Sequence, residues 1–173
     1  MIRHDPLANP RPLIRRVYSF VAYRIGDGAD AEDVTSATFE RALRYRSTFD
    51  PGRGEPLSWL LGIARREIGT YFTHRPLQLG DDVELVTPRD LAEDANARLD
   101  LRLALRKLDD AERELIALRY GADLTARQIA EVLDRKTNAV EVALHRTLRK
   151  LRSELERPQP ADAIAVPEPT PAP

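Results

Sequence analysis

Side chains that could catalyse a reaction or hold a metal are scattered along this chain. Its three histidines, His4, His74 and His145, stand far apart in sequence, whereas a metal site or a catalytic triad needs partners brought together. Cysteine is absent, which excludes a thiolate nucleophile, a disulfide and a cysteine zinc site. Carboxylate pairs at 81–82 and 109–110 fit a linker and a helix start. We therefore expect no enzyme, no metal and no cofactor.

Arginine and aromatic side chains interleave between residues 44 and 75. This combination suits single-stranded DNA, because bases stack on aromatic rings and arginine binds phosphates. Phe49 and Arg53 lie in a stretch rich in turn residues and are the better candidates for this role. Tyr71 and Phe72 instead fit the apolar face of a helix and are expected in the core.

Residues 125–155 have the proportions of a helix-turn-helix. A short helix over Thr125–Leu133 precedes a turn at Asp134–Lys136 and a long helix from Thr137, and the second helix of this motif can enter the major groove. A hairpin within a bundle would instead pair helices of similar length. The apolar positions of the long helix predict its inward face: Val140, Leu144, Leu148, Leu151 and Leu155.

Helical periodicity recurs along most of the chain, and alternation typical of strands is absent from the sequence. We expect helices over 12–25, 30–45 and 57–72, and then over 99–108, 109–121, 125–133 and 137–155. The predicted fold is all-α, with two small helical domains joined by a flexible linker, the second a four-helix domain with a helix-turn-helix. The domains are expected at 10–78 and 99–155, with an acidic linker at 79–98 and a disordered Pro-rich tail at 156–173.

Length and composition fit this layout. The chain has 173 residues, of which 42% are hydrophobic and 32% charged, as in an ordinary folded protein. No run is long and apolar enough for a membrane span or a signal peptide, so we expect a cytoplasmic protein without a membrane partner. The net charge of −1 still permits DNA binding, because an acidic bridge separates two slightly basic blocks.

Several motifs resemble, in order, the bacterial sigma factors. Residues 30–42, from Asp30 to Ala42, are similar to the acidic-start helix of sigma region 2, and residues 49–65 are similar to the promoter-melting segment that follows it. Region 4 is matched by Leu108, Arg113-Glu114 and Leu118-Arg119-Tyr120, then by Leu124-Thr125, Gln128-Ile129-Ala130, His145-Arg146 and Leu151-Arg152. Two such domains with a short linker resemble the extracytoplasmic-function group.

This resemblance implies a sigma factor that binds core RNA polymerase and directs promoter recognition and opening. Its implied partners are core RNA polymerase, promoter DNA and, for some members, an anti-sigma factor. The resemblance implies that polymerase is bound by Asp30, Asp33, Phe39 and Arg41. It also implies that promoter melting depends on Phe49, Arg53, Trp59, Arg65 and Arg66. The residues expected to contact duplex DNA are Lys136, Thr137, Asn138, Glu141, Val142, His145, Arg146 and Arg149.

The sequence departs from the family pattern at a few of these places. Ser36-Ala37 stand where Gln-Glu is common, Arg66 and Thr70 where Asn and Asp are common, and Glu141 where a basic residue is usual. Glutamate can accept a hydrogen bond from the amino group of cytosine but cannot bond to the acceptors of guanine. We therefore expect a different promoter preference from relatives with Arg or Lys at this position.

Two other classes of protein remain open at this point. A stand-alone helix-turn-helix regulator would use its N-terminal helices for dimerisation or ligand binding, which would leave residues 49–66 without a purpose. In a helical adaptor that binds no DNA, the helix face with His145, Arg146 and Arg149 would only be solvated.

Overall fold

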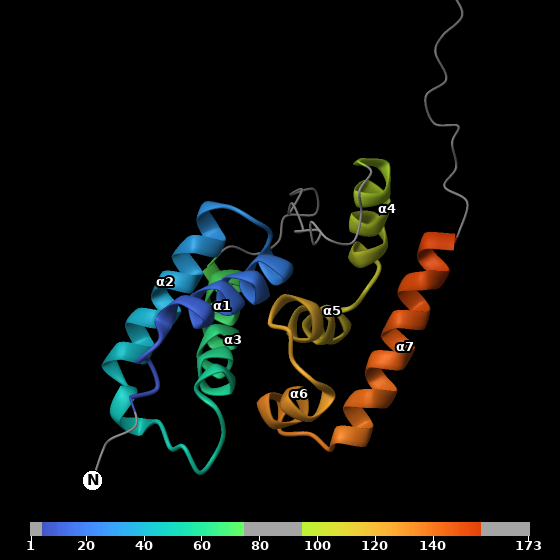
Figure 1. Cartoon of the computed structure of the whole chain (residues 1–173). Coiled ribbons are helices and arrows are strands. Elements are labelled where there is room, and N and C mark those ends of the chain that lie inside the picture. Colours follow the sequence, from blue (N-terminus) through green and yellow to red (C-terminus); the bar gives the residue numbers. More distant parts are fainter. Residues whose placement is uncertain (1–4, 75–94, 157–173) are drawn as a thin grey trace, which may run out of the picture.

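The computed structural model describes residues 5–74 and 95–156, and all regular structure in these two stretches is helical. Figure 1 shows α1–α3 grouped on one side and α4–α7 on the other. The elements are α1 (Pro10–Ile25), α2 (Ala29–Arg44), the 3₁₀ turn η1 (Arg46–Thr48), α3 (Pro56–His74), α4 (Ala95–Arg106), α5 (Asp110–Ile116), the π-helical turn η2 (Ala117–Gly121), α6 (Ala126–Leu133) and α7 (Thr137–Glu156). The predicted all-α fold, with four helices in its second half, is confirmed.

Helices α1, α2 and α3 pack against one another around a shared apolar core. Phe20 of α1 and Leu60 and Leu61 of α3 are completely buried, and each such side chain contributes about 1.5–3 kcal/mol by leaving water. The turn between α1 and α2 contains Gly26 and Gly28, whose φ angles of 99° and 119° suit residues without a Cβ. This tight turn lets α2 fold back directly onto α1 and α3.

Two capping boxes begin the short helices of the second domain. The Asp109 carboxylate accepts from the Glu112 backbone N–H at 2.8 Å, while the Glu112 carboxylate accepts from the Asp109 N–H at 2.9 Å. Thr125 and Gln128 make the equivalent reciprocal pair at the start of α6. Each cap satisfies N–H groups that have no partner inside the helix, and so fixes where α5 and α6 begin.

A left-handed residue produces the turn between α6 and α7. Asp134 has φ 52° and ψ 52°, and the Arg135 N–H donates to the Ala130 carbonyl at 2.9 Å. Aspartate tolerates this conformation better than most residues. The turn therefore closes without glycine, and the predicted helix-turn-helix is present.

The inward face of α7 differs in part from the prediction. Val140 and Leu144 are buried as expected, but Thr147 is also buried, and Leu148 and Leu155 are 37% and 44% exposed. The predictions that Leu148 and Leu155 pack inward are wrong. The buried stripe advances by three and four residues and reaches Thr147 before Leu148, and Leu155 lies in the last turn of the helix, beyond the buried positions. The same rule leaves Ile14 of α1 on the solvent side, at 44% exposure.

The expected linker and tail fall largely outside the described residues. Helix α4 begins at Ala95, ahead of the expected start at Leu99, and the rest of the 79–98 linker lies beyond the described part. The same holds for the tail from residue 157 onward. Within the described part, the two groups of helices pack directly against each other, and one apolar cluster runs through both.

Candidate polymerase and nucleic-acid interfaces

The first candidate surface lies on α2, where the residues expected to bind polymerase differ in exposure. Asp33 is exposed, whereas Asp30 is half-buried and its carboxylate accepts a hydrogen bond from the Tyr71 hydroxyl at 2.9 Å. Phe39 is partly buried against the core. The acidic first turn of α2 also stabilises the positive end of the helix dipole. Of the two acidic residues, Asp33 is the one whose charge is accessible.

Arg41 has a structural partner that the sequence did not reveal. Its Nε lies 2.7 Å from Oε1 of Glu67, a carboxylate on α3 whose side chain is only 10% exposed. This ion pair ties α2 to α3, and the Arg41 side chain still keeps about half of its surface in water, at 51% exposure. Arg41 therefore stabilises the domain as well as contributing to the surface of α2.

The second candidate surface is the loop from Phe49 to Pro56. Its turn is held by the Asp50 carboxylate, which accepts from the Gly52 N–H at 2.9 Å, and by the Asp50 carbonyl, which accepts from the Arg53 N–H at 3.0 Å. Gly54 has φ 147°, a conformation that side chains rarely adopt. The loop is therefore shaped by its own backbone contacts.

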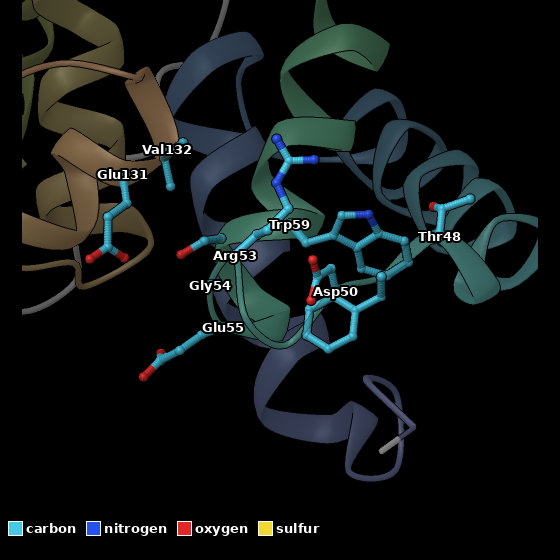
Figure 2. A pocket seen from close by; sticks show the side chains of 10 residues that line it. Thr48, Asp50, Arg53, Gly54, Glu55, Trp59, Glu131 and Val132 are labelled. Atoms are coloured by element: carbon cyan, nitrogen blue, oxygen red, sulfur yellow. The ribbon is translucent and has the colours of Figure 1, made fainter. Parts of the chain in front are cut away.

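Two aromatic side chains, Phe49 and Trp59, contact each other at this loop. The rings of Phe49 and Trp59 lie with centroids 5.6 Å apart and tilted by 57°, within the range of favourable aromatic contacts. Together with Arg53 they line a cavity of about 230 Å³. Figure 2 shows Trp59 and Arg53 on one side of this cavity and Glu131 and Val132, from α6, on the other. Three of the predicted melting residues, Phe49 and Arg53 of the loop and Trp59 of α3, are thus brought together next to the second domain.

Arg65 and Arg66 follow each other on α3 but have different surroundings. Arg66 is exposed to solvent. Arg65 is half-buried and donates from Nε to the Glu114 carboxylate at 2.7 Å, with a second contact of 3.4 Å from Nη2. Its Nη1 donates to the Val132 carbonyl at 3.3 Å. The structure places Arg65 in a contact between the domains, and only Arg66 on an open surface.

The third candidate surface is the outward face of α7 and the turn before it. Of the residues predicted to contact duplex DNA, only Thr137 is half-buried. Those that are exposed are Lys136, Asn138, Glu141, Val142, His145, Arg146 and Arg149. Because Val140 and Leu144 pack inward, this face projects away from the domain. It combines donors, acceptors and positive charges, as a major-groove reader requires.

One contact within this face constrains a histidine. Arg149 Nη2 lies 3.0 Å from His145 Nε2. Since the guanidinium can only donate, this geometry requires Nε2 of His145 to accept, with any ring proton on Nδ1. His145 thereby helps to fix the direction of the Arg149 side chain.

Other kinds of site are not found in the described residues. Across 5–74 and 95–156, no group of three or more His, Asp or Glu side chains is arranged to hold a metal ion. None of the described helices is both long and apolar enough to cross a bilayer. The contacts of the candidate residues that sequence reasoning missed are the acidic partners Glu67 and Glu114 and the α6 residues beside the loop, all of which depend on tertiary packing.

Comparison with known proteins matches both halves of the chain. The family model described as Sigma-70 region 2 matches residues 11–75, and the one described as Sigma-70, region 4 matches residues 104–153. The ECF RNA polymerase sigma factor BldN of Streptomyces coelicolor is 31% identical over 144 residues, covering 78% of this chain and 54% of BldN. This chain thus spans about half the length of that relative. SigK of Mycobacterium tuberculosis (strain H37Rv) is 28% identical over 152 residues, covering 82% of this chain and 80% of SigK.

Solved structures share the same arrangement of helices. The sigma factor RpoE, from its complex with the anti-sigma factor NepR of Bartonella quintana, superposes with a TM-score of 0.66 at 19% identity, covering 85% of this chain and 94% of RpoE. CnrH, in complex with the cytosolic domain of CnrY, gives a TM-score of 0.56 at 26% identity, covering 84% of this chain and 80% of CnrH. With regions 2 and 4 present in order, the chain belongs to the sigma-70 family of RNA polymerase sigma factors, in its extracytoplasmic-function group.

Proposed function

We propose that this chain binds core RNA polymerase and directs it to particular promoters, which it recognises and helps to open. The observation that carries this proposal is the presence, in one chain, of region 2 with its aromatic and arginine loop and region 4 with its exposed helix face. The protein acts by binding, and the polymerase performs the catalysis. Its place of action is the cytoplasm, where polymerase and promoter DNA meet.

In this proposal, α7 reads the upstream promoter element as duplex. Lys136, Arg146 and Arg149 carry the positive charges that suit phosphates, whereas Asn138 and Glu141 can form hydrogen bonds with base edges. All five side chains are exposed. A helix of 20 residues is long enough to lie in the groove and still pack on α4 and α5.

The loop from Phe49 to Pro56 acts on the downstream element once its strands separate. An unstacked base gains about 1–3 kcal/mol by stacking on an aromatic side chain, and Phe49 and Trp59 present such rings beside a cavity. Arg53, on the loop, lines this cavity, and Arg66 is exposed on α3; both suit the phosphates of the single strand. This surface would capture the open strand and favour melting.

The third part of the proposal assigns polymerase binding to α2, through Asp30, Asp33, Phe39 and Arg41. Asp33 gives the cleanest test, because it is exposed while Arg41 also supports the fold through Glu67. We expect Asp33→Lys to reduce co-purification with core polymerase several-fold without changing the unfolding transition. Glu156→Lys, which reverses an exposed acid on α7, is the matched control. Unchanged co-purification of a folded Asp33→Lys variant would refute this assignment.

The whole proposal is tested by run-off transcription. Core polymerase is incubated with genomic DNA fragments, with and without the chain. We expect new transcripts from a limited set of start sites only when the chain is present. A stand-alone helix-turn-helix regulator would instead bind DNA without core polymerase and create no new start sites.

An anti-sigma factor is a further partner that we propose for this chain. The support is the likeness to CnrH and RpoE, each solved in complex with a protein partner. Pull-down from the source organism with the purified chain, followed by transcription with the captured protein added, tests it: the partner should abolish the new transcripts.

A further inference from the structure

Val142 is an apolar residue on the outward face of α7. It is 44% exposed, and the apolar cluster formed by the described residues does not include it. Val142 follows Val140 by two positions, which is a rotation of about 200° around an α-helix. Because Val140 is completely buried, Val142 points almost directly away from the core.

The other two exposed large hydrophobic residues of α7 lie at the margin of its buried face. Leu148 follows the buried Leu144 by four positions. Leu155 follows the half-buried Leu151 by the same step. Each of them is therefore turned by only about 40° from an inward position. Val142 differs from both, because packing on the core does not explain an apolar side chain at its position.

The stability of the helix does not explain Val142 either. Valine is branched at Cβ, which restricts its side chain in a helix and makes it a poorer helix former than alanine. Alanine already occupies the exposed position 139 of the same helix. Since Val142 stabilises neither the core nor the helix, its side chain is available for contact with a partner.

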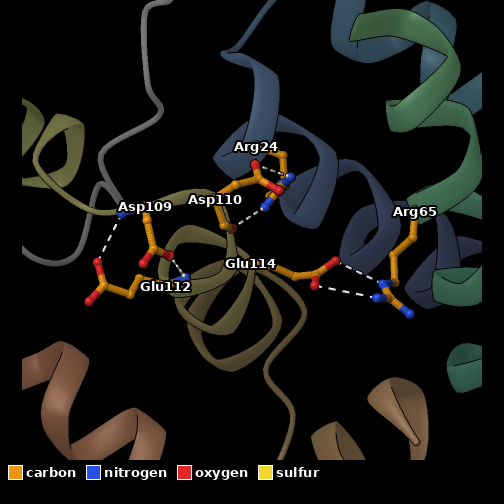
Figure 3. A network of polar contacts seen from close by, with 6 residues as sticks. All are labelled: Arg24, Arg65, Asp109, Asp110, Glu112 and Glu114. Carbon is orange, nitrogen blue, oxygen red and sulfur yellow. Dashed lines mark hydrogen bonds and ion pairs between the residues drawn. The ribbon is translucent and has the colours of Figure 1, made fainter. Parts of the chain in front are cut away.

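The orientation of this face is fixed by contacts between α7 and α5. Lys150 Nζ donates to Oε2 of Glu112 at 2.6 Å, and the same carboxylate accepts from the Asp109 N–H that begins α5. Figure 3 shows Asp109 and Glu112 joined by their two reciprocal hydrogen bonds. Rotation of α7 about its axis would break the contact of Lys150 with Glu112, so Val142 stays on the outer surface.

The charges next to Val142 favour base edges over phosphates at this point of the helix. Helix α7 begins at Thr137, so Val142 lies in its second turn, and the N-terminal part of a recognition helix is the part that reaches the bases. The adjacent Glu141 is exposed, and its negative charge disfavours a phosphate contact here. Arg146, one turn further on, is exposed and has the charge that suits the DNA backbone.

The surface around Val142 is itself poor in free hydrogen-bonding groups. Ala139, three positions earlier, is exposed, and residues at this spacing are neighbours on a helix surface. His145, three positions later, has its outer ring nitrogen Nε2 3.0 Å from Nη2 of Arg149. In this arrangement Nε2 accepts from the guanidinium and is not offered to a base. Ala139 and Val142 therefore form a small apolar strip within a polar face.

We propose that Val142 is a specificity-determining residue that packs against the C5-methyl group of a thymine in the upstream promoter element. This methyl group is an apolar feature of the major groove, and it distinguishes thymine from cytosine. Contact with an apolar side chain withdraws both groups from water and needs no hydrogen bond. The inference rests on the proposed role of α7 in reading duplex DNA, and it adds an apolar contact to the hydrogen bonds expected of Asn138 and Glu141.

Replacement of thymine by uracil tests the proposal, because uracil lacks this methyl group and keeps the same hydrogen-bonding groups. Promoters identified by run-off transcription are prepared as duplexes in which each thymine of the upstream element, on either strand, is replaced in turn. Binding of the polymerase holoenzyme to each duplex is then measured. With the wild-type chain, we expect replacement at one position to weaken binding about fourfold, the effect of one methyl-sized group that is no longer withdrawn from water.

The Val142→Ala variant completes the test. It should bind the thymine promoter more weakly than the wild-type chain, and it should no longer distinguish thymine from uracil at the sensitive position. Its thermal unfolding midpoint should be unchanged or slightly higher, because alanine is the better helix former, whereas a structural role for Val142 predicts a lower midpoint. Leu155→Ala removes an apolar side chain of the same 44% exposure near the end of the helix. This matched control should retain the full preference for thymine.

The result also separates this inference from the proposed function. If the wild-type holoenzyme transcribes from its promoters but is indifferent to uracil at every upstream position, or if the upstream element contains no thymine, only the inference fails. It fails equally if Val142→Ala remains as sensitive to uracil as the wild-type chain. If the wild-type chain directs no promoter-specific transcription with core polymerase, the proposed function fails, and the inference fails with it.

Discussion

The two surfaces that we propose for DNA binding are held in different ways. On α7, the charged side chains project from a helix whose opposite face, with Val140 and Leu144, is buried, so that one face stabilises and the other binds. In region 2, the same side chains serve both purposes: Phe49 packs on Trp59, and Arg65 pairs with Glu114. Separation of roles along α7 follows from helical periodicity, which the loop that carries Phe49 does not have, whereas Arg65 lies on a helix, α3, and pairs with a carboxylate of α5.

This difference has a consequence for mutagenesis. A substitution on the outward face of α7 should alter DNA binding and leave the free energy of unfolding within about 0.5 kcal/mol, as for other surface positions. A substitution at Arg65 or Phe49 removes a contact of the folded chain as well. Variants of region 2 therefore need an assay that isolates strand opening from stability.

The largest effect is expected at the melting loop. Phe49→Ala with Arg53→Ala removes a stacking ring and a phosphate contact, and the loss of stacking alone is worth about 1–3 kcal/mol. Transcription from duplex promoters should fall about tenfold to a hundredfold. The same promoters carrying a mismatch bubble should be affected much less, because their strands are already open. An equal loss on both templates would mean that the loop supports the fold or promoter binding rather than melting.

A smaller and more selective effect is expected at Glu141. Replacing this exposed acceptor by a donor in Glu141→Arg should change which upstream sequence is preferred, by about 1–3 kcal/mol for each altered base contact. Selection from a promoter library measures the preference, and thermal unfolding should be unchanged. Glu156→Arg adds the same charge near the end of the same helix and should leave the preferred sequence as it was. If Glu141→Arg selects the wild-type sequence, Glu141 does not read bases.

The sequence predicted the helices well where local chemistry decides their ends. The reciprocal caps of Asp109 with Glu112 and Thr125 with Gln128 are encoded within four residues, and so is the turn at Asp134. The inward face of α7 was predicted less well, because the apolar pattern contains Leu148 and not the polar Thr147. Thr147 is 2% exposed. The helical spacing puts it on the inward face, although its side chain is polar.

The contacts between domains could not be predicted from sequence patterns. Arg65 and Glu114 are 49 positions apart, and helical periodicity relates only residues within a few turns. Gly121 was interpreted as a helix end, which its position allows, but the structure gives it a second reason in the close approach of Ser19 and Phe20. The candidate functional residues were thus predicted from their residue types and positions in the sequence. The residues that form hydrogen bonds or ion pairs with them could be identified only in the folded structure.

The smallest effect is expected from a single phosphate contact on α7. Arg146→Ala should weaken binding to all promoter sequences alike, and the slope of log affinity against log salt should decrease by about one, since one released counterion is lost. Arg152→Ala removes another exposed arginine of the same helix, one that pairs with Glu156 at 3.5 Å, and should leave that slope unchanged. Binding of the polymerase holoenzyme to a labelled promoter duplex over a range of salt concentrations measures both variants. A change of sequence preference in Arg146→Ala would show that this side chain reads a base, and the boundary between positioning and reading on α7 would then move toward its C-terminal end.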